Sequence, residues 1–195
     1  DRNRLALQSD ILSASVMGIE NILALTGDHP ARGDHPQAKP VYDLDSVQLL
    51  EVIKLLNSGV DMAGNKLDGA PKIFPGAVVN PCADPIEPEI IKLEKKLEAG
   101  AKFFQTQAVF DIGKFEKFIK KIKHIDAPIL AGIILLKSKD MARYMNENVA
   151  GINVPDSLIK EIESVDKSQD RTEKAIEIAA KLINGLKPLC RGAHI

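Results

Sequence analysis

The stretch EAGAKFFQTQAVFD, residues 98–111, contains the repeating unit of this chain in its shortest form. Gly100 stands where a helix would end, because glycine readily adopts the left-handed backbone that closes many helices. Residues 103–110 are rich in aromatic and apolar side chains, which is typical of a strand. Asp111 then stands where an N-cap would begin the next helix. The stretch therefore predicts a helix, a strand and a second helix in direct succession.

The same unit recurs on both sides of this stretch. Further strands are predicted over 21–28, 73–80 and 129–136, and the last residues, AHI, begin another. Helices are predicted over 2–17, 46–57, 88–98, 112–122, 139–146, 156–164 and 169–186. Strands that are buried on both faces and alternate with helices imply a parallel sheet. We therefore predict one α/β domain over residues 1–195 with five parallel strands; an open doubly wound sheet and part of a (β/α)₈ barrel both fit that order.

Composition excludes several function classes. The 195 residues are 45% hydrophobic with a formal net charge of -1, which gives no electrostatic footprint for nucleic acid or an anionic membrane. No apolar run approaches the ~20 residues of a membrane span. The two cysteines, Cys82 and Cys190, are far apart in the sequence, so a disulfide framework is not expected. We therefore expect the protein to reside in the reducing cytoplasm. The four histidines have no metal-ligand spacing, so no metal is predicted.

Asp28, Asn80 and Gln107 stand at or near the C-terminal ends of three predicted strands. Ligands of parallel α/β folds bind at this end of the strands. We therefore expect the three side chains to converge on one rim and form a site. Their residue types do not identify the ligand.

Alternation along a strand assigns the direction of each side chain. Leu23 and Leu25 are expected to face the helices, which turns Asp28 to the opposite side. Gln105 and Gln107 share one face of their strand, and burying two amides is costly unless they form hydrogen bonds. Both glutamines are therefore expected to face the interior of the site.

Structural alternatives exist for each of these polar residues. Asp28 could cap a turn, and Asn80 precedes a proline, where asparagine is common in turns. The two glutamines could form a structural polar layer or face water. Lys95 and Lys96 are best explained as part of a solvated helix face.

Several segments, in order along the chain, resemble the methylenetetrahydrofolate reductase family. LTGDHP (25–30) and the downstream VYDLDSVQLL resemble the region of its fourth barrel strand. FPGAVVNP and KLEKKLEAGAKFFQTQAVFD resemble its fifth and sixth strands, APILAGIILLKS its seventh, and CRGAHI its eighth. The resemblance implies a TIM-type (β/α)₈ barrel, present here in part as strands 4 to 8 with outer helices.

The resemblance also implies a chemistry: reduction of 5,10-methylenetetrahydrofolate to 5-methyltetrahydrofolate by hydride from reduced FAD. Asp28 matches an aspartate near the flavin pyrimidine ring and is the implied catalytic residue. Gln107 matches a glutamine that binds the folate pterin. The resemblance implies cofactor contacts for Asp28, Tyr42, Asn80, Glu89 and Lys96.

The chain also departs from the family pattern. Thr26 replaces a common arginine, and Asp84 replaces a flavin-contacting histidine of some members. No aromatic residue stands near Lys137–Lys139 to stack on nicotinamide, so the electron donor is left open between NADH, NADPH and a redox protein. The family's general acid lies on earlier strands. The chain alone is therefore expected to be inactive and, with free sheet edges, to self-associate.

Two other functions compete with this interpretation. One is a non-catalytic subunit that binds flavin or folate without chemistry. The other is an unrelated aldolase-like barrel enzyme, for which Lys137 is the only candidate Schiff-base lysine.

Overall fold

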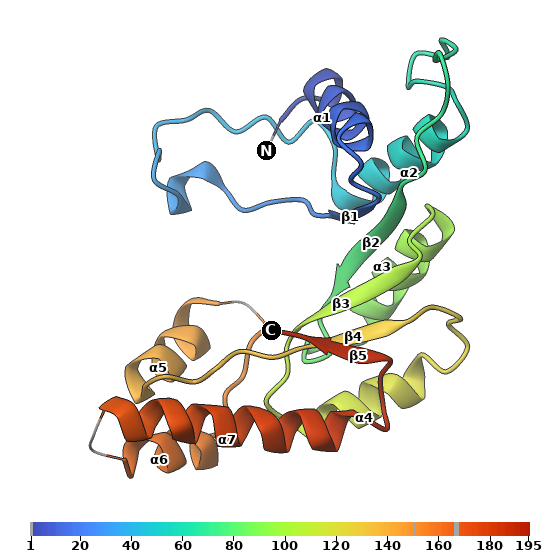
Figure 1. Ribbon diagram of the computed structural model, residues 1–195. Helices are drawn as coiled ribbons and strands as arrows, with labels where there is room; N and C mark the ends of the chain where they lie inside the picture. The colour runs from blue at the N-terminus through green and yellow to red at the C-terminus, as the bar shows by residue number, and fades with distance from the viewer. Residues whose placement is uncertain (1, 150, 166–167) are drawn as a thin grey trace. The chain divides into compact units, whose positions relative to one another are not determined.

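The computed structural model describes residues 2–149, 151–165 and 168–195 (Figure 1). It confirms an α/β fold with five parallel strands, in the sheet order β1-β2-β3-β4-β5. The strands are β1 (Asn21–Ala24), β2 (Phe74–Val79), β3 (Phe103–Ala108), β4 (Ile129–Gly132) and β5 (Gly192–His194). The helices are α1 (Arg4–Val16), η1 (Pro30–Arg32), α2 (Ser46–Asn57), α3 (Glu87–Glu98), α4 (Ile112–Lys121), α5 (Lys139–Asn148), α6 (Asp156–Glu163) and α7 (Ser168–Leu186). A fold of this kind is consistent with part of a TIM-type barrel.

The chain divides into two compact units, one formed by residues 1–78 and 93–103 and the other by 79–92 and 104–195. In the first unit β1 pairs with β2 in parallel, from Asn21 opposite Phe74 to Ala24 opposite Ala77. Helix α2 packs against α1 and β1. It begins where the sequence predicts, because the Asp45 carboxylate accepts a hydrogen bond from the Gln48 backbone amide and the Gln48 side-chain oxygen accepts one from the Asp45 backbone amide.

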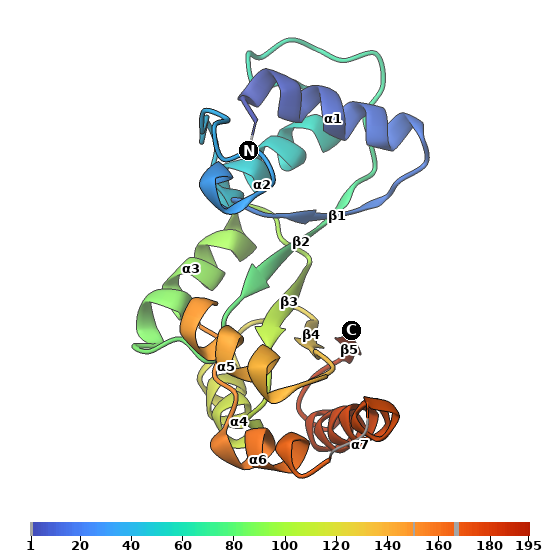
Figure 2. The same ribbon diagram turned by 90° about the vertical axis from the view of Figure 1, so that its left-hand side faces the viewer.

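The second unit contains β3, β4 and β5 with helices α4 to α7. Strands β3, β4 and β5 pair in parallel, and α7 packs against α4 and α6 (Figure 2). The largest side chains of its core are fully buried, among them Phe104, Phe115, Phe118, Ile162 and Leu186. This core carries the C-terminal ends of β3 and β4, where the predicted substrate residue Gln107 lies.

Strands β1 and β4 are each four residues shorter than their apolar runs predict, and β2 and β3 are each two residues shorter. β1 ends at Ala24, because the Thr26 hydroxyl accepts the Ser46 amide at the start of α2 and Gly27 has φ +79°. Leu25 is consequently 51% exposed, so the prediction that it faces the helices is wrong. β4 ends at Gly132, although Ile133 and Leu136 remain buried in the loop that follows. None of the helices in the described part of the chain is long and apolar enough to span a membrane.

Candidate functional site

Side chains alternate along β3 as the sequence predicts. Phe104, Thr106 and Ala108 are buried, whereas Phe103, Gln105 and Gln107 are half-buried. Within the described residues neither glutamine amide has a side-chain partner. Gln107 therefore presents a free amide donor and acceptor near the end of its strand.

A β-bulge lies directly beneath Gln107. β3 pairs with β4 through Phe104 with Ile129, Gln105 with Leu130 and Ala108 with Gly132. Thr106 and Gln107 thus both lie opposite the single residue Ala131. Bulges of this kind bend a strand and redirect its side chains, and they are common beside functional sites.

Thr106 holds this bulge in place. Its buried hydroxyl accepts the Gly132 amide at 3.0 Å and donates to the Gln107 carbonyl at 2.7 Å. Nε2 of His194, on β5, lies 3.2 Å from the Thr106 carbonyl oxygen, which can only accept. A side chain at Gly132 would place its Cβ 2.5 Å from that same oxygen. The roles of Thr106, Gly132 and His194 could not be predicted from the sequence, because they depend on a bulge that only the strand register reveals.

Asn80 and Glu89, two predicted cofactor residues, lie together in the second unit. The Asn80 backbone amide donates a hydrogen bond to the Glu89 carboxylate at 2.8 Å. The Asn80 side-chain oxygen accepts one from the Cys82 backbone amide at 3.0 Å. Asn80 therefore also stabilises a turn, as the structural alternative for this residue predicts. Gly151, with φ +81°, lies so close that an added Cβ would fall 1.7 Å from Nδ2 of Asn80. No pattern in the sequence predicts that Gly151 lies against Asn80.

Lys96 does not lie on a solvated helix face, and that interpretation is wrong for this residue. It is only 5% exposed, and its ammonium group donates a hydrogen bond to the Val78 carbonyl in β2. The neighbouring Lys95 is exposed, as predicted. A buried charge on a helix is tolerated here because it satisfies a backbone acceptor near the end of β2.

Asp28 and Tyr42 lie in the first unit with Lys96. The Asp28 carboxylate is exposed. Tyr42 has a left-handed backbone, φ +42°, and its ring centroid lies 6.2 Å from that of His29. Residues 28–42 therefore form a loop that returns to the region just after β1. Asp28, Tyr42 and Lys96 thus belong to one unit, and Asn80, Glu89 and Gln107 to the other.

Metal ligands do not gather in the described ranges: no group of three or more His, Cys, Asp or Glu side chains there could hold a metal ion.

Comparison with known proteins gives a consistent result. A family model described as methylenetetrahydrofolate reductase matches residues 1–194. A probable methylenetetrahydrofolate reductase (NADPH) of Caenorhabditis elegans is 26% identical over 90% of this chain and 26% of its own length. A 5,10-methylenetetrahydrofolate reductase of Pectobacterium carotovorum is 26% identical over 78% of this chain and 46% of its own length. The chain thus spans less than half the length of these curated relatives.

A solved structure gives the fold comparison. It is titled an uncharacterized protein from Clostridium thermocellum that binds two copies of 5-methyl-5,6,7,8-tetrahydrofolic acid. It aligns with a TM-score of 0.50 over 89% of this chain and 64% of its own, at 17% identity. At this identity the likeness shows a shared fold.

Proposed function

Because this chain belongs to the methylenetetrahydrofolate reductase family, we propose that it forms the flavin- and folate-binding part of an enzyme that reduces 5,10-methylenetetrahydrofolate to 5-methyltetrahydrofolate. The observation that carries this proposal is the family match over residues 1–194. The names of the curated relatives support an oxidoreductase acting on folate. The structural neighbour that binds methyltetrahydrofolate supports folate as the ligand class.

Gln107 is the residue to which we assign folate recognition. Its half-buried amide has no partner in the described residues and follows directly on a bulge held by Thr106. A pterin edge presents hydrogen-bond donors and acceptors in turn, and a neutral amide offers one of each. The bulge fixes the backbone from which this amide extends, which reduces the entropy lost on binding.

The polar residues near the strand ends are of types that can form hydrogen bonds with a flavin. Asp28 offers an exposed carboxylate, Tyr42 a phenol and Asn80 an amide whose oxygen is already oriented by the Cys82 amide. The Glu89 carboxylate accepts a hydrogen bond from the Asn80 backbone amide and so stabilises the loop that follows β2. Lys96 donates a hydrogen bond to the Val78 carbonyl, which fixes its ammonium group near the end of β2.

Bound FAD would supply the hydride for this reaction. We assign Asp28 to the region of the flavin pyrimidine ring, where its negative charge disfavours further negative charge and so tunes the reduction potential. Tyr42, Asn80, Glu89 and Lys96 would position the cofactor, and Gln107 the pterin. We assign no general acid to this chain. NADH, NADPH or a redox protein would supply the electrons, and the site of action would be the cytoplasm.

The proposal is tested by steady-state turnover of the purified complete enzyme that contains this chain, with FAD, NADH or NADPH, and methylenetetrahydrofolate. Chromatography should detect 5-methyltetrahydrofolate that accumulates in proportion to enzyme. Binding of flavin and folate without product, under either donor or with a chemical reductant, would instead identify a non-catalytic binding module.

A further inference from the structure

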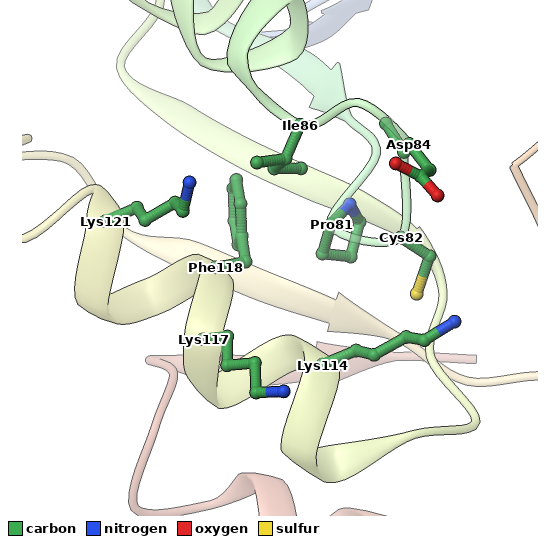
Figure 3. A pocket seen from close by; sticks show the side chains of 9 residues that line it. Pro81, Cys82, Asp84, Ile86, Lys114, Lys117, Phe118 and Lys121 are labelled. Carbon is green, nitrogen blue, oxygen red and sulfur yellow. The ribbon is translucent and has the colours of Figure 1, made fainter.

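A cavity of about 230 Å³ lies between helix α4 and the loop that follows β2 (Figure 3). Both walls belong to the second unit. The cavity is lined by Pro81, Cys82, Ala83, Asp84, Ile86, Lys114, Lys117, Phe118 and Lys121. It is smaller than the ~300–1,000 Å³ typical of pockets for drug-sized molecules, so its occupant must be small.

Three lysines of α4 line this cavity against one carboxylate, that of Asp84. Lys114, Lys117 and Lys121 are three and four residues apart, so they share one face of the helix. Lys121 is neutralised by Glu87 at 2.6 Å. Within the described residues no acidic side chain pairs with Lys114 or Lys117.

A fourth lysine of α4, Lys120, provides a comparison. Lys120 is not among the residues that line the cavity, and it forms an ion pair with Glu116, one turn earlier, at 2.7 Å. The chain thus pairs the lysine on the solvent face of α4 and leaves two on the cavity face unpaired. Lys114 and Lys117 are exposed and extend in different directions in Figure 3, and such flexible side chains can turn toward an anion at the cavity and supply its counter-charge.

The opposite part of the wall is apolar. The Phe118 side chain, 1% exposed, faces Ile86 and Pro81 across the cavity in Figure 3. Such a wall suits a flat or aliphatic body rather than a bare, hydrated ion. Cys82 lies beside Lys114 at the other end, where burial raises the pKa of its thiol and Lys114 partly opposes that rise.

We propose that this cavity binds a small organic anion, in which a carboxylate or phosphate group meets Lys114 and Lys117 while an apolar body lies against Phe118 and Ile86. This site is separate from the assigned role of Gln107 and does not depend on the proposed reductase activity. Phenyl phosphate has the required chemistry and serves as the probe. Inorganic phosphate supplies the charge alone, and benzyl alcohol supplies the apolar body alone.

Cys82 reports occupancy directly. The purified protein is treated with iodoacetamide, and the labelling rates of Cys82 and Cys190 are followed by peptide mass spectrometry. Phenyl phosphate should slow labelling of Cys82, and at equal concentration inorganic phosphate and benzyl alcohol should each slow it far less. Cys190, whose thiol bonds to the Leu186 and Gly192 carbonyls outside the cavity, is the internal reference and should not respond.

The double variant Lys114→Ala/Lys117→Ala should need about tenfold more phenyl phosphate for half-protection, a loss expected for two partly exposed charges. For each variant, the Cys82 labelling rate with phenyl phosphate is divided by the rate without it. This ratio is needed because removal of Lys114 itself changes the pKa of the Cys82 thiol. Lys120→Ala is the matched control and should keep the affinity of the unaltered protein. The proposal is overturned if phenyl phosphate leaves Cys82 labelling unchanged, if the double variant is protected equally well, or if inorganic phosphate alone protects as strongly.

Discussion

Gln107 and Gln105 lie on the same face of β3, but only Gln107 extends from the bulge. Loss of a buried hydrogen-bond partner for the pterin should cost roughly 1–3 kcal/mol. In the complete enzyme, Gln107→Ala should therefore weaken folate use by roughly 5- to 150-fold, at ~1.4 kcal/mol per decade. Flavin content should barely change, because we assign the flavin contacts to other residues.

Gln105→Ala is the matched control, since it removes the same amide from the same face two residues earlier. It should affect stability more than folate kinetics. Steady-state kinetics and flavin occupancy are measured for both variants. Unchanged folate kinetics in Gln107→Ala would return this glutamine to a structural polar layer.

Thr106 allows the bulge itself to be tested. Thr106→Val keeps the shape of the side chain but leaves the Gly132 amide without its hydroxyl partner, at a cost of about 1–3 kcal/mol. The midpoint of urea unfolding should fall accordingly. KM for folate should rise as the Gln107 backbone loses its support, while the flavin spectrum is retained.

Thr106→Ser keeps the hydroxyl and should restore most of the affinity for folate. A valine variant that loses stability but keeps its KM would show that the bulge supports the fold and not Gln107. The two variants thus separate a positioning role from general destabilisation.

At the scale of single elements, local chemistry made some boundaries predictable. The bounds of α2 are those that the sequence predicts, because Asp45 and Gln48 cap it within four residues of chain. β1 is not predictable in the same way, because it ends where Thr26 bonds to Ser46, twenty residues later. Buried apolar residues after Gly132 likewise resemble a strand in sequence while forming a loop.

Helix α1 is anchored at its start by an ion pair that should respond to acid. The Arg4 guanidinium and backbone amide both donate to Asp43 and lower the pKa of that carboxyl to about 2. The unfolded chain holds this proton with a pKa near ~3.9, so folding favours the ionised form. The stabilisation is complete above about pH 4 and is lost as the pH falls toward 2.

Arg4→Met should remove this contribution, so that its loss of stability relative to the unaltered protein is largest near pH 6 and shrinks near pH 3. Urea midpoints at both pH values measure it. Arg2→Met, which removes the more exposed pair with Asp10, is the control. A penalty for Arg4→Met that is the same at both pH values would show that the ion pair does not anchor the helix.

At the scale of the whole molecule, the sheet order places β1 and β5 at its two ends, each with one neighbouring strand. Unpaired strand edges favour association with another chain. We therefore expect the protein to form homo-oligomers at micromolar concentration. Sedimentation velocity across a concentration series measures this, and a monomer at every concentration with flavin still bound would contradict it.

The sequence proposes Asp28, Asn80 and Gln107 as site residues because each stands near the C-terminal end of a predicted parallel strand. The structure places Asn80 and Gln107 in one unit and Asp28 in the other, so their common rim stays a prediction. The close approach of Gly151 to Asn80 joins residues seventy-one positions apart, and the hydrogen bond of the buried Lys96 is to a carbonyl eighteen residues away. Such contacts follow from tertiary packing, which residue type and spacing do not encode.

The central claim, hydride transfer from a bound flavin to folate, is tested most directly by a single half-reaction that needs no knowledge of the electron donor. The complete enzyme that contains this chain is loaded with FAD and reduced chemically without oxygen until its absorbance at ~450 nm is bleached, and methylenetetrahydrofolate is then added. The account predicts that the ~450 nm band returns while one equivalent of 5-methyltetrahydrofolate forms. Failure of the protein to retain FAD, or a band that stays bleached in the presence of bound folate, would contradict it.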